Sequence, residues 1–221
     1  MILVLSIGGS VIDHDRDRLT EYARVLRDLR SDHTVFVVVG GGVTAREYIG
    51  MARAFDADET FCDLIGIAVT RLNARLLIAA LGSAAYPVPP ETQEDASVAV
   101  LSGRIVVMGG TTPGHTTDAV AAILAEYVHA DILIDATSTD GIYTKDPKKH
   151  PDSVKLDELS PARLIEIIAA ERMEAGANLP LDILSAKIIE RSGIPTVVLD
   201  GREPGLVVDA VNGKRVGTRV R

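Results

Sequence analysis

The sequence has no tryptophan, one cysteine and few aromatic residues, and each shortage excludes something. The single Cys62 excludes an internal disulfide, and a small buried side chain in a reducing compartment is its simplest interpretation. Aromatic residues make up 4% of a chain that is 47% hydrophobic. The core must therefore be built mainly from aliphatic side chains, which suits a largely buried parallel sheet with packed helices.

Basic charge is also in short supply. The 221 residues carry a formal net charge of −8, with a sequence pI of about 5.1. Such a chain lacks the basic surface of a nucleic-acid-binding protein, so we expect no nucleic-acid partner. The apolar start has no basic flank and stops at Gly8-Gly9, and no apolar run reaches the length of a membrane span. We therefore expect neither a signal peptide nor a membrane contact, and predict a cytoplasmic protein.

Apolar strand-like runs alternate with helical patterns along the chain. The predicted strands are 2–7, 34–39, 85–88, 104–108, 132–136, 196–199 and an edge strand at 215–220. The predicted helices are 16–30, 43–55, 59–81, 92–101, 116–129, 161–174, 181–192 and 204–211, with a loop or irregular hairpin at 139–151. This order predicts one α/β domain spanning 1–221, a three-layer sandwich around a central, mostly parallel sheet.

The long predicted helix 59–81 has apolar side chains on one stripe, which predicts its packed face. These side chains are Phe61, Leu64, Ile65, Ala68, Leu72 and Leu76. Asp63 lies on the opposite side, where an aspartate is ordinarily exposed.

Glycine-rich turns follow the first two predicted strands, at the edge of the sheet where ligands gather in parallel folds. They are Gly8–Ser10 and Gly40–Gly42. Glycine lets the backbone approach a ligand closely, and bare N–H groups at a helix start attract an anion. Arg46 adds a positive charge one turn into the second helix. The alternative is a pair of tight turns followed by a solvated arginine.

A third loop, Gly109–Asp118, holds four threonines and a histidine among small residues. A helix cap explains one threonine but not four. Asp118 would stabilise the helix dipole, or orient a donor or a lysine near a transferring phosphate. In the polar segment 136–147, Tyr143 could stack on a base, and Asp146 could simply start a turn.

Phosphoryl transfer depends on positive charge and positioning more than on covalent chemistry. Lys187, on the predicted helix 181–192, is a candidate for that charge, and a solvated lysine is the alternative. The sequence contains no CxxC, HExxH or GxSxG motif, so zinc and serine-hydrolase chemistry are not expected.

Five segments in order resemble the amino acid kinase superfamily, most closely the archaeal-type uridylate kinases. They read IGGS, VVVGGGxxAR, MGGTxPGHTTDAVAA, TxxDGIYTKDPKK and AKIIERSGIPT. The resemblance covers essentially the whole chain. It implies a UMP kinase that makes UDP and ADP from UMP and ATP with Mg²⁺, and a homohexamer built as a trimer of dimers.

The resemblance also implies roles for single residues. ATP would be bound by Gly8, Gly9, Ser10, Gly42, Arg46, Thr137, Tyr143 and Asp146. UMP would be bound by Gly41, Asp63, Thr111, Thr112, Pro113, Gly114, His115, Thr116 and Thr117. Lys187, Asp118 and Arg46 would be catalytic, with no protein ligand to a metal. The acceptor part would span roughly 1–130 and the ATP part roughly 131–221.

One position departs from the pattern. Many relatives have a lysine two residues before the first glycine pair, where this chain has Ser6. Serine carries no charge, so Lys187, Arg46, Mg²⁺ and the N–H groups of Gly8–Ser10 would stabilise the transition state. Two alternatives to a UMP kinase stay open. One is a related kinase acting on isopentenyl phosphate, carbamate or an acylated amino acid, and the other is a non-catalytic nucleotide sensor.

Overall fold

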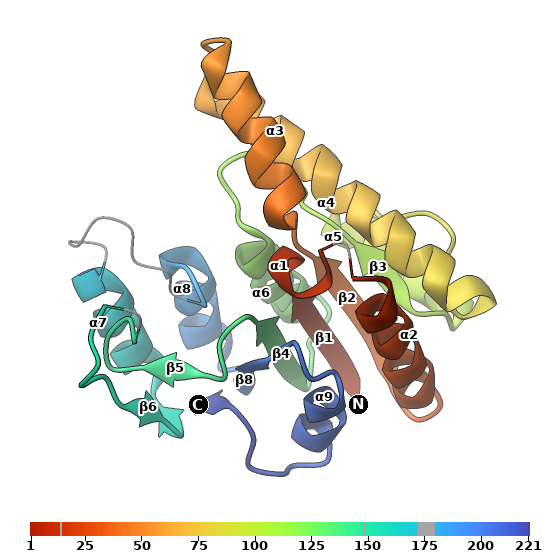
Figure 1. The fold of residues 1–221 in the computed structure, drawn as a ribbon. Helices are drawn as coiled ribbons and strands as arrows, with labels where there is room; N and C mark the ends of the chain where they lie inside the picture. The colour runs from red at the N-terminus through yellow and green to blue at the C-terminus, as the bar shows by residue number, and fades with distance from the viewer. Residues whose placement is uncertain (14, 148, 172–179) are drawn as a thin grey trace.

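The computed structural model describes residues 1–13, 15–147, 149–171 and 180–221. These residues form a central seven-stranded sheet with helices around it (Figure 1). The strand order is β3-β2-β1-β4-β8-β9-β7. The strands are β1 (Ile2–Ile7), β2 (Thr34–Val39), β3 (Val106–Met108), β4 (Ile132–Thr137), β7 (Glu158–Leu159), β8 (Thr196–Asp200) and β9 (Thr218–Val220), and a separate pair is β5 (Ile142–Tyr143) with β6 (Lys155–Leu156). The first five strands in the sheet run parallel, and β9 runs antiparallel to β8. This confirms a mostly parallel sheet.

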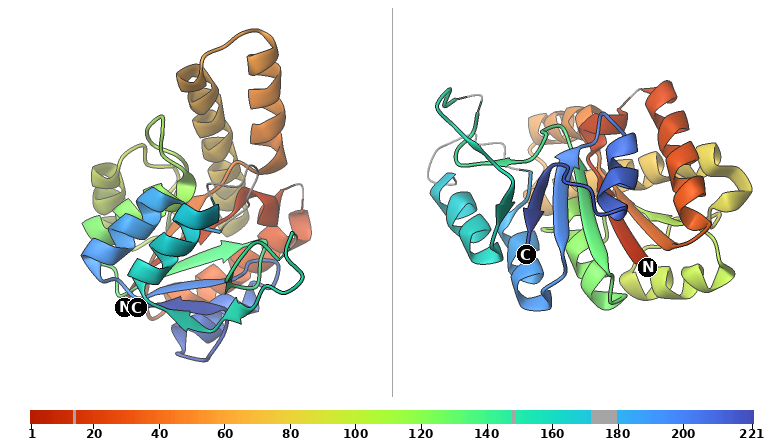
Figure 2. Two further views of the ribbon diagram at one scale, coloured as in Figure 1. Left: turned by 90° about the vertical axis from the view of Figure 1, so that its left-hand side faces the viewer. Right: turned by 90° about the horizontal axis from the view of Figure 1, so that it is seen from below.

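Helices cover both faces of the sheet and complete the three predicted layers (Figure 2). The α-helices are α1 (Gly9–Ile12), α2 (Arg16–Arg30), α3 (Gly42–Ala54), α4 (Glu59–Leu81), α5 (Gln93–Ala99), α6 (Thr117–Tyr127), α7 (Pro161–Glu171), α8 (Ile183–Ser192) and α9 (Gly205–Val211), with 3₁₀ turns η1 (Gly82–Ala84) and η2 (Val100–Ser102). Side chains of α2, α4 and α9 form one core cluster with the sheet. Side chains of α5, α6, α7 and α8 form the other.

Strand β1 is the centre of the arrangement because it pairs with both β2 and β4. Its residues alternate between the two core clusters, with Leu5 and Ile7 in one and Val4 in the other. Ser6 therefore faces the α6 side of the sheet, and it lies in register with Val38 on β2 and Asp135 on β4. The parallel direction brings the ends of β1, β2 and β4, and the segments that follow them, to one edge.

The predicted packed face of α4 is wrong. The buried residues are Cys62, Ile67, Val69, Thr70, Ala74, Leu77 and Leu81. Four members of the predicted stripe, Phe61, Leu64, Leu72 and Leu76, are instead about half exposed (50–55%). The physical reason is that small and polar side chains of α4 meet the backbone of the glycine turns, so these four large apolar side chains point outward.

Helices α3 and α4 form a hairpin that projects from the rest of the chain (Figures 1 and 2). Tyr48, Met51 and Phe55 on the α3 side are also exposed, Phe55 to 83%. By length and composition alone the stretch Glu59–Ala84 would suffice to cross a membrane, a test that core helices of soluble proteins also pass. Helix α4 packs on α2, α3, β2 and β3, and the absence of a membrane contact stays a prediction.

Other boundaries moved for local reasons. The predicted strand 85–88 is reduced to one bridge, Ala85 with Ile105, because prolines at 87, 89 and 90 remove backbone donors. The predicted edge strand at 215–220 is β9, but it lies inside the sheet because β7 pairs outside it. The expected irregular hairpin at 139–151 contains β5, which pairs with β6. The predicted end of helix 161–174 lies outside the described residues.

Candidate active site

The first two glycine turns pack directly against each other at the carboxyl end of β1 and β2. A Cβ atom on Gly9 would lie 1.9 Å from the backbone nitrogen of Gly42, and one on Gly40 would lie 2.4 Å from that of Gly9. Such distances leave no room for any side chain. The Gly8 N–H donates to the carbonyl of Ala136 (2.9 Å), and the Gly40 N–H donates to that of Ile7 (2.9 Å). The two turns are thus tied to each other and to the end of β4.

Two side chains hold the second turn in place. Asn73 of α4 donates its amide to the carbonyls of Gly40 (2.9 Å) and Gly41 (3.4 Å). Asp13 accepts a short hydrogen bond from the Val43 N–H. A carboxylate thus lies at the start of α3, close to Gly42, which the sequence predicts to bind ATP. Arg46 is exposed one turn further into α3.

The third loop also contacts α4, about one turn before Asn73. The Gly110 N–H donates to the hydroxyl of Thr70 (2.7 Å), and Arg71 donates from Nε to the Gly110 carbonyl (3.2 Å). A Cβ on Gly109 would lie 2.5 Å from the Thr70 hydroxyl and 2.7 Å from the Arg71 nitrogen. The glycines after β3 therefore serve a close approach of the backbone to α4.

Asp63 meets the threonine-rich loop, as its predicted role requires. Its carboxylate accepts a hydrogen bond from the Gly114 N–H (2.7 Å). Around this contact Thr111, Pro113 and Thr117 are partly exposed, and Thr112, Gly114, His115 and Thr116 are exposed. The loop therefore presents hydroxyl and N–H groups to solvent beside a carboxylate from α4.

Thr116 is the cap of helix α6. Its hydroxyl oxygen accepts from the Ala119 N–H (3.1 Å), and its hydroxyl donates a short hydrogen bond to Asp182. Asp182 in turn caps α8 by accepting from the Ser185 N–H (2.8 Å). These contacts bring the starts of α6 and α8 together.

Two acids and a serine lie between β1, β4 and α6. The Ser6 hydroxyl donates to Asp118 Oδ1 (3.0 Å). Burial raises the pKa of Asp118 to about 7, with a smaller upward contribution from Asp182. Burial also raises the pKa of Asp135 well above its ordinary value, and the Asp118 charge adds to this effect. Both carboxyl groups therefore favour their protonated forms more than an exposed aspartate does.

Three of the residues predicted to bind ATP, Thr137, Tyr143 and Asp146, lie at the end of β4 or after it. Thr137 ends β4, and its carbonyl accepts from the Gly201 N–H (2.7 Å). The Tyr143 hydroxyl donates to Asp140 (2.9 Å), whose other oxygen accepts from Lys155 (3.0 Å). Asp146 is buried to 4% exposure. Tyr143 thus has a polar partner that the sequence analysis did not foresee.

Lys187 lies on the solvent side of α8. It forms an ion pair with Glu190 (3.0 Å), and its side chain is 57% exposed. The buried residues of the same helix are Ser185, Ala186, Ile188 and Ile189. The static structure therefore places Lys187 away from the packed face of α8, and its catalytic role stays a prediction.

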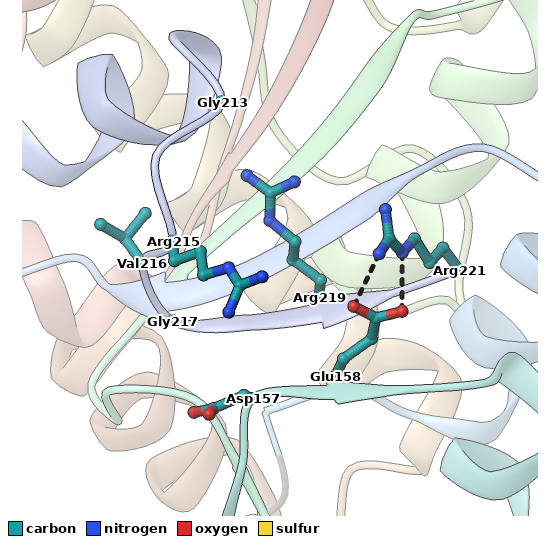
Figure 3. A pocket seen from close by; sticks show the side chains of 8 residues that line it. All are labelled: Asp157, Glu158, Gly213, Arg215, Val216, Gly217, Arg219 and Arg221. Carbon is teal, nitrogen blue, oxygen red and sulfur yellow. Dashed lines mark hydrogen bonds and ion pairs between the residues drawn. The ribbon is translucent and has the colours of Figure 1, made fainter.

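A cavity of about 630 Å³ lies at the other end of the fold, along β7 and β9 (Figure 3). Arg215, Arg219 and Arg221 line it, and Glu158 binds Arg221 through two hydrogen bonds (2.7 and 2.8 Å). The cavity contains none of the predicted site residues.

Several residues at the site escaped the sequence analysis. Asp135 had a detectable signal, because a lone charge in the apolar strand Ile132–Thr137 must be either partnered or neutral. Asp182 also had one, since aspartate before an apolar helix is a typical N-cap. Asn73 and Thr70 had none, because their contacts are with glycine turns distant in sequence.

Within the described residues, no three His, Cys, Asp or Glu side chains group closely enough to hold a metal ion. That part of the chain offers no protein cage for a metal.

Comparisons with known proteins agree over nearly the whole length. A uridylate kinase of Methanosarcina mazei is 54% identical over 216 residues, covering 97% of this chain and 93% of that protein. A uridylate kinase of Archaeoglobus fulgidus is 52% identical over 218 residues, covering 99% of each.

Solved structures of a uridylate kinase and of a UMP kinase also match the chain. The crystal structure of uridylate kinase from Archaeoglobus fulgidus matches with a TM-score of 0.93 and 49% identity, covering 100% of both chains. The UMP kinase of Ureaplasma parvum, with a TM-score of 0.80 and 21% identity, shares the fold and covers 100% of this chain and 98% of its own. A sequence profile of the amino acid kinase family matches residues 1–200, and the chain belongs to that family.

Proposed function

We propose that this chain is a UMP kinase, which transfers the γ-phosphoryl group of ATP to UMP and produces UDP and ADP for pyrimidine nucleotide biosynthesis. The observation that carries the proposal is the meeting of Asp63 with the threonine-rich loop at the Gly114 N–H. A carboxylate suits the hydroxyls of a ribose, and the surrounding hydroxyl and N–H groups suit a phosphate. The relatives named uridylate kinase share about half of their residues with this chain over almost its full length.

In the proposed site, one set of residues binds ATP and another binds UMP, and the glycine turns contribute to both sets. Gly8, Gly9, Ser10, Gly42 and Arg46 would hold the ATP phosphates. Thr137, Tyr143 and Asp146 would border the rest of the ATP molecule. Gly41, Asp63 and the loop 111–117 would hold UMP. The split of the domain into an acceptor part, roughly 1–130, and an ATP part, roughly 131–221, belongs to the same proposal.

The proposed reaction is a direct in-line displacement with no covalent intermediate on the protein. A phosphate oxygen of UMP attacks the γ-phosphorus, the bond to the β–γ bridging oxygen breaks, and ADP leaves. The N–H groups of Gly9 and Ser10 at the start of α1, with Arg46, would offset the charge on the transferring group. Lys187 would have to leave Glu190 and swing toward the site, which an exposed, flexible side chain can do at small cost. Magnesium enters as MgATP, the donor substrate.

An acceptor screen tests the proposal. ADP release is measured with MgATP and, separately, UMP, CMP, isopentenyl phosphate, carbamate and N-acetylglutamate. We expect turnover with UMP to exceed that with the chemically distinct acceptors by at least about 100-fold, because a site that hydrogen-bonds its substrate rejects analogues lacking the partner groups. If another acceptor is phosphorylated faster than UMP, the chain is a kinase of the same family with that acceptor as its substrate. Binding of ATP and UMP without ADP release would make it a sensor.

We further propose a cytoplasmic homo-oligomer, specifically a hexamer arranged as a trimer of dimers. The support for self-association is the hairpin α3–α4, which exposes Tyr48, Met51, Phe55, Phe61, Leu64, Leu72 and Leu76. Exposed apolar side chains on a projecting hairpin favour a surface that a partner covers. Static light scattering on the purified chain measures the subunit number, and a monomer at micromolar concentration would contradict this part.

A further inference from the structure

The partly exposed Asp118 and the buried Asp135 lie beside one serine, and the predicted role of Asp118 does not explain this arrangement. Asp135 is 1% exposed, in the middle of the sheet, and its Oδ2 has no hydrogen-bond partner among the described residues. Its register partner on β1 is Ser6, and both side chains project toward α6 and α8. Asp118 begins α6 on the same side and accepts from the Ser6 hydroxyl. Two carboxyl groups therefore flank one hydroxyl.

Ser6 has a single hydroxyl hydrogen, so it cannot donate a hydrogen bond to two ionised carboxyl groups at once. A serine hydroxyl has one hydrogen, which here points to Asp118. The hydroxyl oxygen can only accept a further hydrogen bond. The Asp135 carboxyl, which also lies within hydrogen-bonding reach of Ser6, can use that oxygen only if it carries a proton.

The surroundings offer no positive charge in compensation. The charged group that acts on both acids is another carboxylate, Asp182 at the start of α8, and it raises both pKa values. Ser6 on β1 is the group that lowers them. Within the described part of the chain, no lysine or arginine contributes to either pKa. Burial of an unpaired charge is costly, so the acids respond by retaining a proton.

We propose that Asp118 and Asp135 share one proton across the Ser6 hydroxyl, with Asp135 as the neutral member that donates to Ser6. In this arrangement Asp135 is a positioning residue that limits the acidic pair to one negative charge at the floor of the site. The functional part of this inference rests on the proposed kinase activity. Loss of the last proton would put a second negative charge beside the phosphates of ATP and UMP, and would repel them.

The first experiment follows the thermal midpoint of the chain without substrates from pH 5 to 9, for the wild type and Asp135→Asn. Asparagine is neutral at every pH and can donate to Ser6 as a protonated aspartate does. Because the folded pKa values lie above the unfolded ones, the folded state holds more protons, and stability falls as pH rises toward the folded values. The wild type should lose stability relative to the variant, by several degrees at pH 9.

Three results would overturn the proton-sharing pair. The first is parallel melting profiles of wild type and Asp135→Asn, and the second is an Asp135→Asn chain that does not fold at pH 7. The third is a rise in the midpoint of the wild type, but not of the variant, with Mg²⁺ alone at pH 8, which would make the pair a cation site. Ser6→Ala provides an independent check. It removes the hydrogen bond that lowers the pKa of Asp118, so the pH-dependent loss of stability that Asp118 contributes should move to higher pH.

The second experiment measures kcat/KM for UMP over the same pH range. The wild type should lose activity on the alkaline side, whereas Asp135→Asn should stay level and exceed it about tenfold at pH 9. Asp32→Asn removes an exposed acid just before the start of β2, far from the glycine turns, and should keep the wild-type profile. If kcat/KM falls on the alkaline side for Asp135→Asn as it does for the wild type, the proposed effect of the acidic pair on activity is refuted. If the melting profiles differ as expected but UMP is not phosphorylated, the pair stands and the proposed function fails.

Discussion

Helix α4 separates two regions that are built in opposite ways. On the side of the glycine turns, polar side chains are turned inward, where Thr70, Asn73 and Asp63 hold backbone groups of loops that are distant in the sequence. On the hairpin side, Phe61 and Leu64 of the same helix are turned outward and half exposed. The site is therefore an assembly of polar contacts, of which the Thr70 contact is buried and the Asp63 contact is exposed, and the hairpin is an apolar surface.

The difference teaches where substitutions should matter to a single chain. An unpartnered buried N–H costs about 1–3 kcal/mol, so the contact of Thr70 with the Gly110 N–H contributes to folding as well as to site geometry. An exposed apolar side chain contributes little to the free energy of unfolding of an isolated chain. Its contribution appears only when a partner covers it.

The largest effect should come from Gly9→Ala. The added Cβ would lie 1.9 Å from the Gly42 nitrogen, and both groups belong to turns that cannot separate without breaking the site. We expect kcat for UMP phosphorylation to fall at least about 1,000-fold, because a misplacement of about 1 Å already costs about 100-fold. Gly205→Ala is the matched control, since a Cβ there meets open space. Wild-type turnover by Gly9→Ala would show that the two turns do not need their close contact.

Lys187→Ala should be next, with a loss of about 100-fold in kcat, if the lysine reaches the transferring phosphoryl. Its exposed ion pair with Glu190 predicts a change in stability below about 1 kcal/mol. Glu190→Gln breaks the same ion pair but keeps the lysine, and should retain most of the activity. Steady-state kinetics together with thermal melting measure both effects. A near-normal kcat for Lys187→Ala would restrict the lysine to the surface of α8.

Thr70→Val should have a moderate effect on stability. Valine has nearly the shape of threonine but cannot accept the hydrogen bond from the Gly110 N–H, which stays buried. We expect a loss of about 1–3 kcal/mol in the free energy of unfolding, measured by urea denaturation. Thr60→Val, on the exposed start of α4, should change it by less than about 0.5 kcal/mol. Equal effects of the two changes would remove the contrast between the inward and outward sides.

The smallest effect on the stability of the single chain belongs to the hairpin. Phe55→Ser combined with Phe61→Ser removes two exposed aromatic side chains, and we expect less than about 1 kcal/mol of change per dissociated chain. Light scattering should nevertheless show a reduced subunit number. Val98→Ser with Leu101→Ser is the control, because these side chains are as exposed but lie on α5 and η2. Loss of assembly in the control alone would move the interface to that surface.

Sequence reasoning was sufficient for the fold because it rests on local patterns. The alternation of strands and helices predicted the layers and the parallel sheet, and it placed the first two glycine turns at the carboxyl edge of that sheet. It failed for α4, where apolar periodicity was taken to mark the buried face. The register of β1 with β4, which sets Asp135 beside Ser6, is a property of pairing between distant segments. The family resemblance supplied the role of Asp63, whereas its hydrogen bond to Gly114 required three dimensions.

The hydrogen bonds from Asn73 to Gly40 and Gly41 couple the position of the second glycine turn to that of helix α4. Helix α4 has 23 residues, and a helix of that length is a stiff rod of about 35 Å. Its outward leucines and the amide that holds the second turn are fixed to the same rod. A neighbouring molecule that clamps the hairpin would therefore damp the motion of the glycine turn, so the precision of the site would depend on how firmly the distant end is held.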